Sequence, residues 1–322
     1  MATETAHPPS PDHPGALNWA LLVALGVIWG AAFMGIALSL RGFDPMSVAA
    51  LRTVFGALAL LAIASALGQG PGALWRAGGA RGLRFIATLG VTMVAVPYGL
   101  LAWALQHVPS AFAGVAMGAV PLLVLPLVAI FTPDEGIGPR RLAGVGLGFV
   151  GLVVLIGPGA LASGADAALA GRLACIAVAF CYAVSMVVTR RAPPMPPVGF
   201  AAGTLVAGSV VLTPLMLAVE GWPAHWPAGP TAALLFTALL PTAVAAAMRV
   251  QIIVTAGSLF MSLTNYIVPV FSVIFGIALM GETPDAGLYA GLGLILAGIA
   301  LAQSRALSRI LSRALLARFR QR

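Results

Sequence analysis

The sequence predicts an all-α integral membrane protein with ten transmembrane helices, arranged as two inverted five-helix repeats. Apolar residues make up 60% of the 322-residue chain and charged residues only 8%, against about 25% charged residues in soluble domains. Ten apolar stretches are each near the length of about 20 residues that a helix needs to cross the hydrocarbon core. The two halves also repeat each other in the spacing of proline, glycine and acidic residues.

The ten apolar stretches fill nearly the whole chain, with short connections between them. They are rich in Leu, Ala and Gly and do not alternate every second position, which favours helices over a transmembrane barrel. The stretches cover residues 17–40, 46–67, 83–105, 110–131 and 140–157 in the first half, and 169–190, 198–219, 230–254, 257–280 and 285–304 in the second half.

The segments outside the spans complete the predicted domain organisation. Residues 1–16 are proline-rich without periodic apolar residues, which indicates a disordered tail, and they lack the basic residues of a cleaved signal. Residues 305–322 place an apolar residue at nearly every fourth position among arginines, which predicts an amphipathic helix on an anionic leaflet. The expected units are the tail 1–16, a first repeat 17–157, a linker 158–168, a second repeat 169–304 and the basic helix 305–322.

The arginines predict the orientation of the chain in the membrane. All 17 basic residues are arginine. If the N-terminus is cytoplasmic, thirteen of them lie in inside segments, Arg41 and Arg172 lie outside, and Arg52 and Arg249 lie within spans. The positive-inside rule therefore places both termini in the cytoplasm. Because this rule explains the sequence pI of about 11.0, no nucleic-acid partner is expected.

Proline, glycine and acidic residues show the internal repeat. When Pro121 is aligned with Pro269, Asp134 falls opposite Glu282. With a shift of one residue, Gly144, Gly146 and Gly151 fall opposite Gly291, Gly293 and Gly298. Each half has five spans, an odd number, so the second half is inverted relative to the first. Inverted repeats are typical of transporters whose substrate site lies near the membrane midplane between the halves.

Four prolines within the spans are candidate hinges. A proline inside a helix removes one backbone hydrogen bond and leaves the carbonyl four residues earlier available to another partner. The candidate hinges are Pro97, Pro121, Pro241 and Pro269. Below Pro269 the freed carbonyl belongs to Asn265, and Thr264, Asn265 and Tyr266 bring three polar side chains to membrane depth. This group is either part of a site or a set of hydrogen bonds between helices.

Aromatic side chains away from the membrane interfaces supply further candidates for substrate binding. They could wall a cavity that stacks a planar ring or holds an ammonium group, or they could simply pack the core. Arg52, about 9 Å into its span, could bind a carboxylate, whereas Arg249 could extend its side chain to the cytoplasmic surface. The full candidate set is Trp29, Phe33, Arg52, Tyr98, Trp103, Met117, Tyr182, Asn265 and Tyr266.

The nine carboxylates all fall in tails, loops or span ends, where Asp134 and Glu282 are expected to cap helices or act as gates. Proton-coupled pumps usually relay through an intramembrane Asp, Glu or His, so a facilitator that follows the substrate gradient is favoured. An intramembrane protease or metalloenzyme would need paired carboxylates, a Ser–His pair or clustered ligands at depth, so no enzyme, metal or cofactor is expected. Cys175 and Cys181 are interpreted as packing residues.

Several short motifs in order resemble one known family over the whole chain. They are Trp29-Gly30, Asp44-Pro45, Leu51-Arg52, Ala104-Leu105-Gln106, Pro109-Ser110-Ala111, Pro121 before Asp134-Glu135, and Pro269 before Gly281-Glu282. Together these residues resemble the EamA family of the drug/metabolite transporter superfamily. The resemblance implies two inverted five-helix halves and export of amino acids or related metabolites across the bacterial inner membrane by alternating access.

The candidate aromatic residues make the chain similar to the exporters of aromatic amino acids within that family. The short drug exporters of the superfamily use a carboxylate in the first helix, where this chain has Trp29, Gly30 and Phe33, so proton-coupled export of lipophilic cations is not expected. A different drug or metabolite exporter and a channel remain alternatives. The expected partners are a small-molecule substrate and membrane lipid, and the chain is expected to be a monomer or homodimer.

Overall fold

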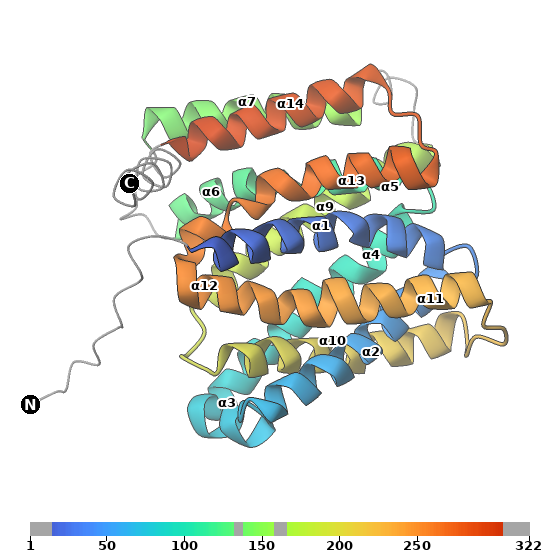
Figure 1. The fold of residues 1–322 in the computed structure, drawn as a ribbon, viewed down its shortest axis with the longest axis vertical. Coiled ribbons are helices and arrows are strands. Elements are labelled where there is room, and N and C mark those ends of the chain that lie inside the picture. The colour runs from blue at the N-terminus through green and yellow to red at the C-terminus, as the bar shows by residue number, and fades with distance from the viewer. Residues whose placement is uncertain (1–14, 132–137, 158–165, 305–322) are drawn as a thin grey trace, which may run out of the picture.

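A computed structural model describes residues 15–131, 138–157 and 166–304, and the secondary structure in these ranges is entirely helical (Figure 1). The predicted N-terminal tail up to residue 14, the predicted basic helix at 305–322, Asp134 and most of the linker lie outside the described residues.

The first half contains five spans, two of which are divided into shorter helices. The third span joins α3, a π-helical turn η1 and α4, and the fourth joins α5 and α6. The elements are α1 (Ala16–Ser39), α2 (Pro45–Ala66), α3 (Pro71–Leu89), η1 (Gly90–Ala95), α4 (Val96–Ala104), α5 (Ser110–Met117), α6 (Val120–Phe131) and α7 (Pro139–Ile156).

The second half repeats this order. Its third span again contains a π-helical segment, η2, between two α-helices. The elements are α9 (Ala167–Thr189), α10 (Pro197–Val219), α11 (Ala228–Thr237), η2 (Ala238–Val244), α12 (Ala245–Met261), α13 (Thr264–Met280) and α14 (Ala286–Ala302). Eight of the described helical segments are long and apolar enough to cross a membrane, and α13 and α14 are shorter apolar helices. The ten predicted spans are confirmed.

Two spans are longer than their apolar stretches. The third begins at Pro71 instead of residue 83, because Pro71 starts a short helix that buries Leu74 beside Gly199 and Gly203 of α10 before a kink at Gly79. The eighth runs to Met261 instead of residue 254 and bends at Gly257, whose φ of 87° is a left-handed conformation that favours glycine. The apolar pattern missed the first extension because residues 71–82 are less apolar than the span they precede. It assigned residues 257–261 to the ninth span, which in the structure begins at Thr264 instead of residue 257 because α12 continues through the bend at Gly257.

The pairing of α7 with α14 shows that the two halves are inverted. A side chain at Gly144 would meet the backbone of Gly298, and a side chain at Gly291 would meet the backbone of Gly151. Because Gly144 corresponds to Gly291 and Gly151 to Gly298, the two contacts are images of each other under a twofold axis. Their order also shows that the helices are antiparallel. Figure 1 shows this pair at one end of the molecule.

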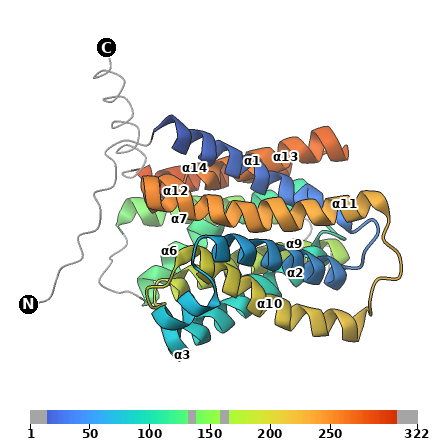
Figure 2. The same ribbon diagram turned by 60° about the horizontal axis from the view of Figure 1, so that its bottom comes forward.

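The pairing of α2 with α10 follows the same twofold relation at the opposite end of the molecule, where both views keep these helices together (Figures 1 and 2). Gly56 and Gly208 occupy equivalent positions, since each follows the first proline of its helix by the same number of residues. Gly56 packs against Ala238 and Thr242 of η2, and Gly208 packs against Gly90 and Val94 of η1. The π-helical segments are therefore the places where α2 and α10 cross the neighbouring spans.

Carboxylate and amide side chains from the loops cap several helices. The carboxylate of Glu220 accepts hydrogen bonds from the backbone nitrogens of Met46 (2.9 Å) and Ser47 (2.7 Å) at the start of α2. On the opposite side of this helix pair, Gln69 Oε1 accepts from the nitrogens of Val198 and Gly199 at the start of α10. These acceptors satisfy backbone donors that a helix leaves free at its N-terminus.

Glu282 caps α5 in the same manner. Its carboxylate accepts from the backbone nitrogens of Ser110 (2.6 Å) and Ala111 (3.0 Å) and from the Ser110 hydroxyl (2.7 Å). The expectation that this acid caps a helix is confirmed, although it caps a helix from the other half of the chain. A negative charge at a helix N-terminus also interacts favourably with the helix dipole.

Candidate functional site

The candidate site is built on the irregular backbone of η2. Pro241 has no N–H, so the carbonyl of Thr237, four residues earlier, loses its helical donor. The hydroxyl of Thr242 donates to this carbonyl at 2.8 Å instead. The Pro241 carbonyl accepts a hydrogen bond of 3.1 Å from the indole Nε1 of Trp29 in α1. The π-helical turn thus presents polar groups to two neighbouring helices in the interior of the protein.

Arg52 of α2 reaches this turn from the other side. Its Nε donates to the Thr242 hydroxyl at 3.0 Å, and its guanidinium carbon lies 4.1 Å from the centroid of the Tyr98 ring in α4. The side chain is 7% exposed. A guanidinium over an aromatic face is held by attraction to the electron-rich ring. The fold therefore fixes the cation in one orientation through its Nε and its planar face.

The terminal nitrogens of Arg52 remain available to a ligand. Within residues 15–131, 138–157 and 166–304, neither terminal nitrogen makes a hydrogen bond or an ion pair. Neither is fully enclosed, so both are accessible to a ligand. Two parallel N–H groups of a guanidinium match the two oxygens of a carboxylate. The geometry around Arg52 therefore suits bidentate binding of a carboxylate.

Tyr182 of α9 completes the group around the guanidinium. It lies close enough to Arg52 and Tyr98 to interact electrostatically with both. We use the name Arg52 cluster for Trp29, Arg52, Tyr98, Tyr182 and Thr242. These residues come from five spans of both halves, and the longest sequence separation is bridged by the Trp29–Pro241 hydrogen bond. Four of the five are candidates from the sequence.

The other candidates occupy different surroundings. Phe33 is buried, and Met117 and Tyr266 are partly buried, in the same hydrophobic core as Tyr98 and Tyr182. The Tyr266 hydroxyl is enclosed and has no hydrogen-bond partner within the described residues. Asn265 is partly buried in the first turn of α13. These four residues remain predicted substrate contacts.

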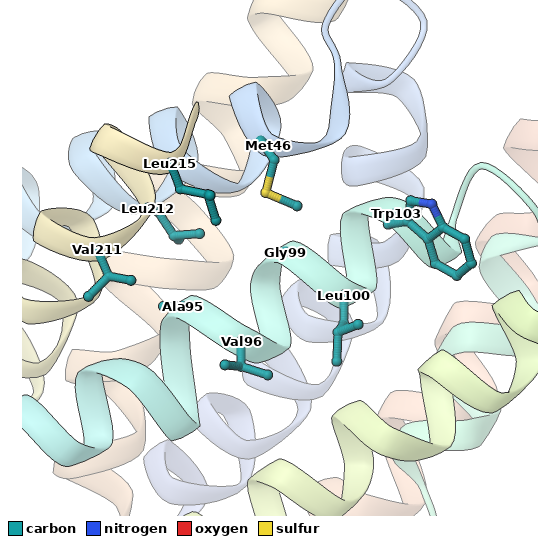
Figure 3. Close-up of a pocket in the computed structure, with 9 residues that line it drawn as sticks. All are labelled: Met46, Ala95, Val96, Gly99, Leu100, Trp103, Val211, Leu212 and Leu215. Carbon is teal, nitrogen blue, oxygen red and sulfur yellow. The ribbon is translucent and has the colours of Figure 1, made fainter. Parts of the chain in front are cut away.

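Trp103 lies apart from the Arg52 cluster. It is 36% exposed near the end of α4 and packs against His107, with 4.7 Å between the ring centroids and 60° between the ring planes. It also borders a groove of about 280 Å³ that runs between α4 and α10 (Figure 3). The residues lining this groove are Met46, Ala95, Val96, Gly99, Leu100, Trp103, Val211, Leu212 and Leu215. The lining is almost wholly apolar and includes no member of the Arg52 cluster, so it does not suit a zwitterion.

The four candidate hinge prolines have different local geometries. Pro97 is the second residue of α4, which begins where η1 ends; Pro241 lies within η2; and Pro121 is the second residue of α6, after the turn that separates it from α5. Pro269 lies inside the continuous helix α13, where it packs against Gly118. Three of the four therefore coincide with a departure from α-helical geometry. Their role as hinges remains a prediction.

Only one of the two equivalent crossings carries the polar group. The residue of α10 equivalent to Arg52 is Thr204, whose hydroxyl bonds the Phe200 carbonyl of its own helix. The residue of η1 equivalent to Thr242 is Val94. Because the Val94 crossing forms the same packing without an arginine, the architecture does not require Arg52. This difference between equivalent positions favours a binding role for the Arg52 cluster.

Sequence reasoning missed Thr242. The signal that could have identified it is a threonine directly after an intramembrane proline, since its hydroxyl can replace the missing backbone donor.

Comparison with known proteins identifies the family. Residues 17–157 and 169–303 each match the EamA-like transporter family. The chain belongs to the EamA-like transporter family. It is therefore a transmembrane transporter, and its two halves are the two repeats of this family.

Curated relatives match nearly the whole chain. One, from Streptantibioticus cattleyicolor, is described as a probable terminal-alkyne amino-acid exporter and is 27% identical over 90% of this chain and 94% of its own length. Another, the inner membrane transporter YedA of Escherichia coli, is 28% identical over 87% of this chain and 88% of its own length. A solved crystal structure that is 24% identical covers 90% of this chain and 98% of its own, with a TM-score of 0.64, which shows a shared fold.

Proposed function

We propose that this EamA-like transporter exports neutral amino acids, including aromatic ones, or closely related metabolites from the cytoplasm. The single observation that carries the proposal concerns the guanidinium of Arg52 beside Tyr98 and Tyr182. Its Nε and its planar face are bound by the protein, while its terminal nitrogens have no partner among the described residues. The terminal nitrogens of Arg52 would bind the substrate carboxylate, and the tyrosine rings would contact its side chain. The amino-acid exporter among the relatives supports this substrate class.

We further propose that transport follows the substrate gradient by alternating access between the two inverted repeats. The described carboxylates lie at helix ends and do not enter the Arg52 cluster: Asp166, Glu220, Glu282 and Asp285 cap helices, and Asp44 precedes α2. Without an acid or histidine in the cluster, a proton relay through the centre has no carrier. Residues around Pro97 and Pro241 would absorb the change of helix geometry.

Transport into proteoliposomes tests the proposal. Labelled phenylalanine and other neutral amino acids are offered to the wild type, to Arg52→Gln and Tyr98→Ala, and to Trp103→Ala and Asn265→Ala. The exposed residues Arg41 and Tyr289 provide matched controls as Arg41→Gln and Tyr289→Ala. We expect saturable uptake that the cluster variants lower at least about tenfold, since each loses a contact to a charged or aromatic group.

Two results would contradict the proposal. Wild-type vesicles that take up none of the offered amino acids would refute the substrate class, and equal kinetics in wild type and Arg52→Gln would refute the site. For coupling, an imposed pH gradient that drives uphill accumulation would refute the facilitator mechanism.

A further inference from the structure

Arg249 of α12 is a second intramembrane cation, and the fold turns it toward the protein interior. The exposed residues nearest to it are Val244 at the end of η2, and Gln251 and Val254 in α12. At about 100° of rotation per residue, each lies roughly 140–160° around the helix axis from Arg249. Ala245 and Ile252, which share the Arg249 side of the helix, are fully buried. Arg249 therefore points away from the lipid. Its side chain does not extend along the outer surface toward the headgroups.

The guanidinium of Arg249 has no partner among the residues that the structure describes. Within the described ranges 15–131, 138–157 and 166–304, it makes no hydrogen bond, ion pair or cation–π contact. In these ranges, only the hydroxyls of Thr231 and Tyr266 are both fully enclosed and without a hydrogen-bond partner. The nitrogens of Arg249 also lack a partner but are not fully enclosed, so water or a ligand can reach them. An ionised arginine inside a span is costly and normally pairs or serves a function.

Arg249 lies between the Arg52 cluster and one end of the bundle. Thr242, which binds Arg52, precedes it by seven residues, or about 10 Å along the helix axis. Thr255, which bonds Asn18 near the start of α1, follows it by six residues, or about 9 Å. The end that Asn18 marks is the one that the arginine distribution predicts to be cytoplasmic.

We propose that Arg249 is a second anion-binding residue, which receives the carboxylate of the substrate on its way from the cytoplasm to Arg52. This inference deepens the proposed function and rests on it for the direction of transport. The ligand class is a small molecule with a carboxylate. Five N–H donors in a planar fork make the free guanidinium selective for this group over a neutral amide.

Thermal unfolding of the purified protein tests the anion site without transport. Benzoate and the neutral benzamide are the probes, at constant ionic strength, because a ligand that binds only the folded state raises the unfolding temperature. We expect benzoate, and not benzamide, to raise the unfolding temperature of the wild type and of Arg41→Gln. In an Arg52→Gln background, which lacks the other carboxylate-binding residue, adding Arg249→Gln should raise the half-maximal benzoate concentration about tenfold or more, since charged hydrogen bonds are lost.

Arg249→Lys keeps the charge but loses the bidentate fork, so we expect an intermediate response, about threefold weaker than the wild type. If Arg249→Gln does not fold, Arg249→Lys is compared with the wild type instead. Absence of a benzoate shift in the wild type, or an undiminished shift in the Arg249 variant that folds, would overturn the inference.

The KM for phenylalanine in proteoliposomes separates this inference from the proposed function. An Arg249-dependent benzoate shift in a protein that transports no amino acid would refute the substrate and keep the anion site. Phenylalanine transport with the same KM in wild type and Arg249→Gln would keep the function and overturn the role of Arg249 on the path.

Discussion

At the scale of single residues, the Thr242 hydroxyl makes two hydrogen bonds. It donates to the carbonyl that Pro241 deprives of its helical donor, and it accepts from Arg52 Nε. A hydroxyl is suited to this position because it is donor and acceptor at once. The stability of η2 and the orientation of the Arg52 guanidinium therefore depend on one side chain.

Thr242→Val removes both hydrogen bonds while nearly keeping the side-chain shape. We expect the free energy of unfolding to fall by about 1–3 kcal/mol, because the Thr237 carbonyl and Arg52 Nε each lose a hydrogen-bond partner. Amino-acid transport should fall in parallel as the guanidinium loses its fixed orientation. Thermal unfolding and uptake assays measure the two effects.

Thr231→Val is the matched control, since the Thr231 hydroxyl is enclosed and has no partner within the described residues. It should leave stability unchanged or raise it. Equal effects of the two substitutions would show that the Thr242 hydrogen bonds contribute nothing specific.

The Glu282 carboxylate also acts at this scale, as the cap that joins the loop before α14 to the start of α5. Glu282→Ala leaves the backbone nitrogens of Ser110 and Ala111 without their acceptor. We expect a loss of about 1–3 kcal/mol in unfolding free energy, measured by thermal or denaturant unfolding in detergent.

Asp44→Ala provides the comparison, because the exposed Asp44 side chain makes no capping hydrogen bond at the start of α2. A Glu282→Ala protein as stable as Asp44→Ala would exclude a structural role for the cap.

At the scale of elements, the two π-helical segments stand where equivalent helices cross. A π-helical turn inserts an extra residue and shifts the facing of everything beyond it, which is why such turns recur at functional sites. In η2 this shift accompanies the Pro241 carbonyl that receives the Trp29 indole and the Thr242 hydroxyl that receives Arg52.

Pro241→Ala restores a backbone donor to the middle of η2. We expect the segment to move toward regular α-helix, which rotates the groups that contact Trp29 and Arg52 and lowers transport several-fold with little loss of stability. Uptake kinetics together with thermal unfolding check this outcome.

Pro214→Ala is the control at this scale, because Pro214 lies inside the regular helix α10. It should leave transport unchanged. A Pro241→Ala transporter with wild-type kinetics would show that the irregular turn is dispensable.

At the scale of the whole molecule, the inverted repeat closes through glycine contacts between α7 and α14. A side chain at Gly298 would lie 2.7 Å from the Gly144 oxygen and 2.7 Å from the Gly148 nitrogen, both backbone atoms. Backbone cannot yield as a flexible side chain does, so the two helices would have to separate.

Gly298→Ala is therefore expected to destabilise the protein by about 1–3 kcal/mol through overpacking. Gly293→Ala, in the same helix, meets nothing within 4 Å and should be neutral or stabilising. Thermal unfolding of the two variants decides the matter, and equal stability would contradict the close packing of these helices.

Orientation in the membrane also belongs to the whole molecule. In a background where Cys175 and Cys181 are replaced by Ala, a cysteine in place of the exposed Arg41 should react with an impermeant maleimide from outside the cell. A cysteine in place of the exposed Arg76 should react only after permeabilisation. The reverse pattern would overturn the predicted cytoplasmic termini.

The sequence predicted several members of the candidate site but could not group them. Arg52, Tyr98, Tyr182 and Trp29 were candidates because polar and aromatic side chains at membrane depth are individually conspicuous. Trp103 is equally conspicuous, yet it borders the apolar groove. Thr242 is inconspicuous and lies at the centre. The direction in which a side chain points depends on the π-helical turns, and no local sequence pattern predicts these turns.

The sequence by itself determined the membrane class, the ten spans and the inversion of the halves, because composition, apolar length and repeat spacing are local or periodic properties of the chain. Only the tertiary structure decided which side chains meet. Arg52 and Thr242 lie 190 residues apart and are joined by a crossing of α2 with η2. Equivalent crossings in the two halves share a backbone geometry, but only the folded arrangement shows that one of them holds a cation with free donors.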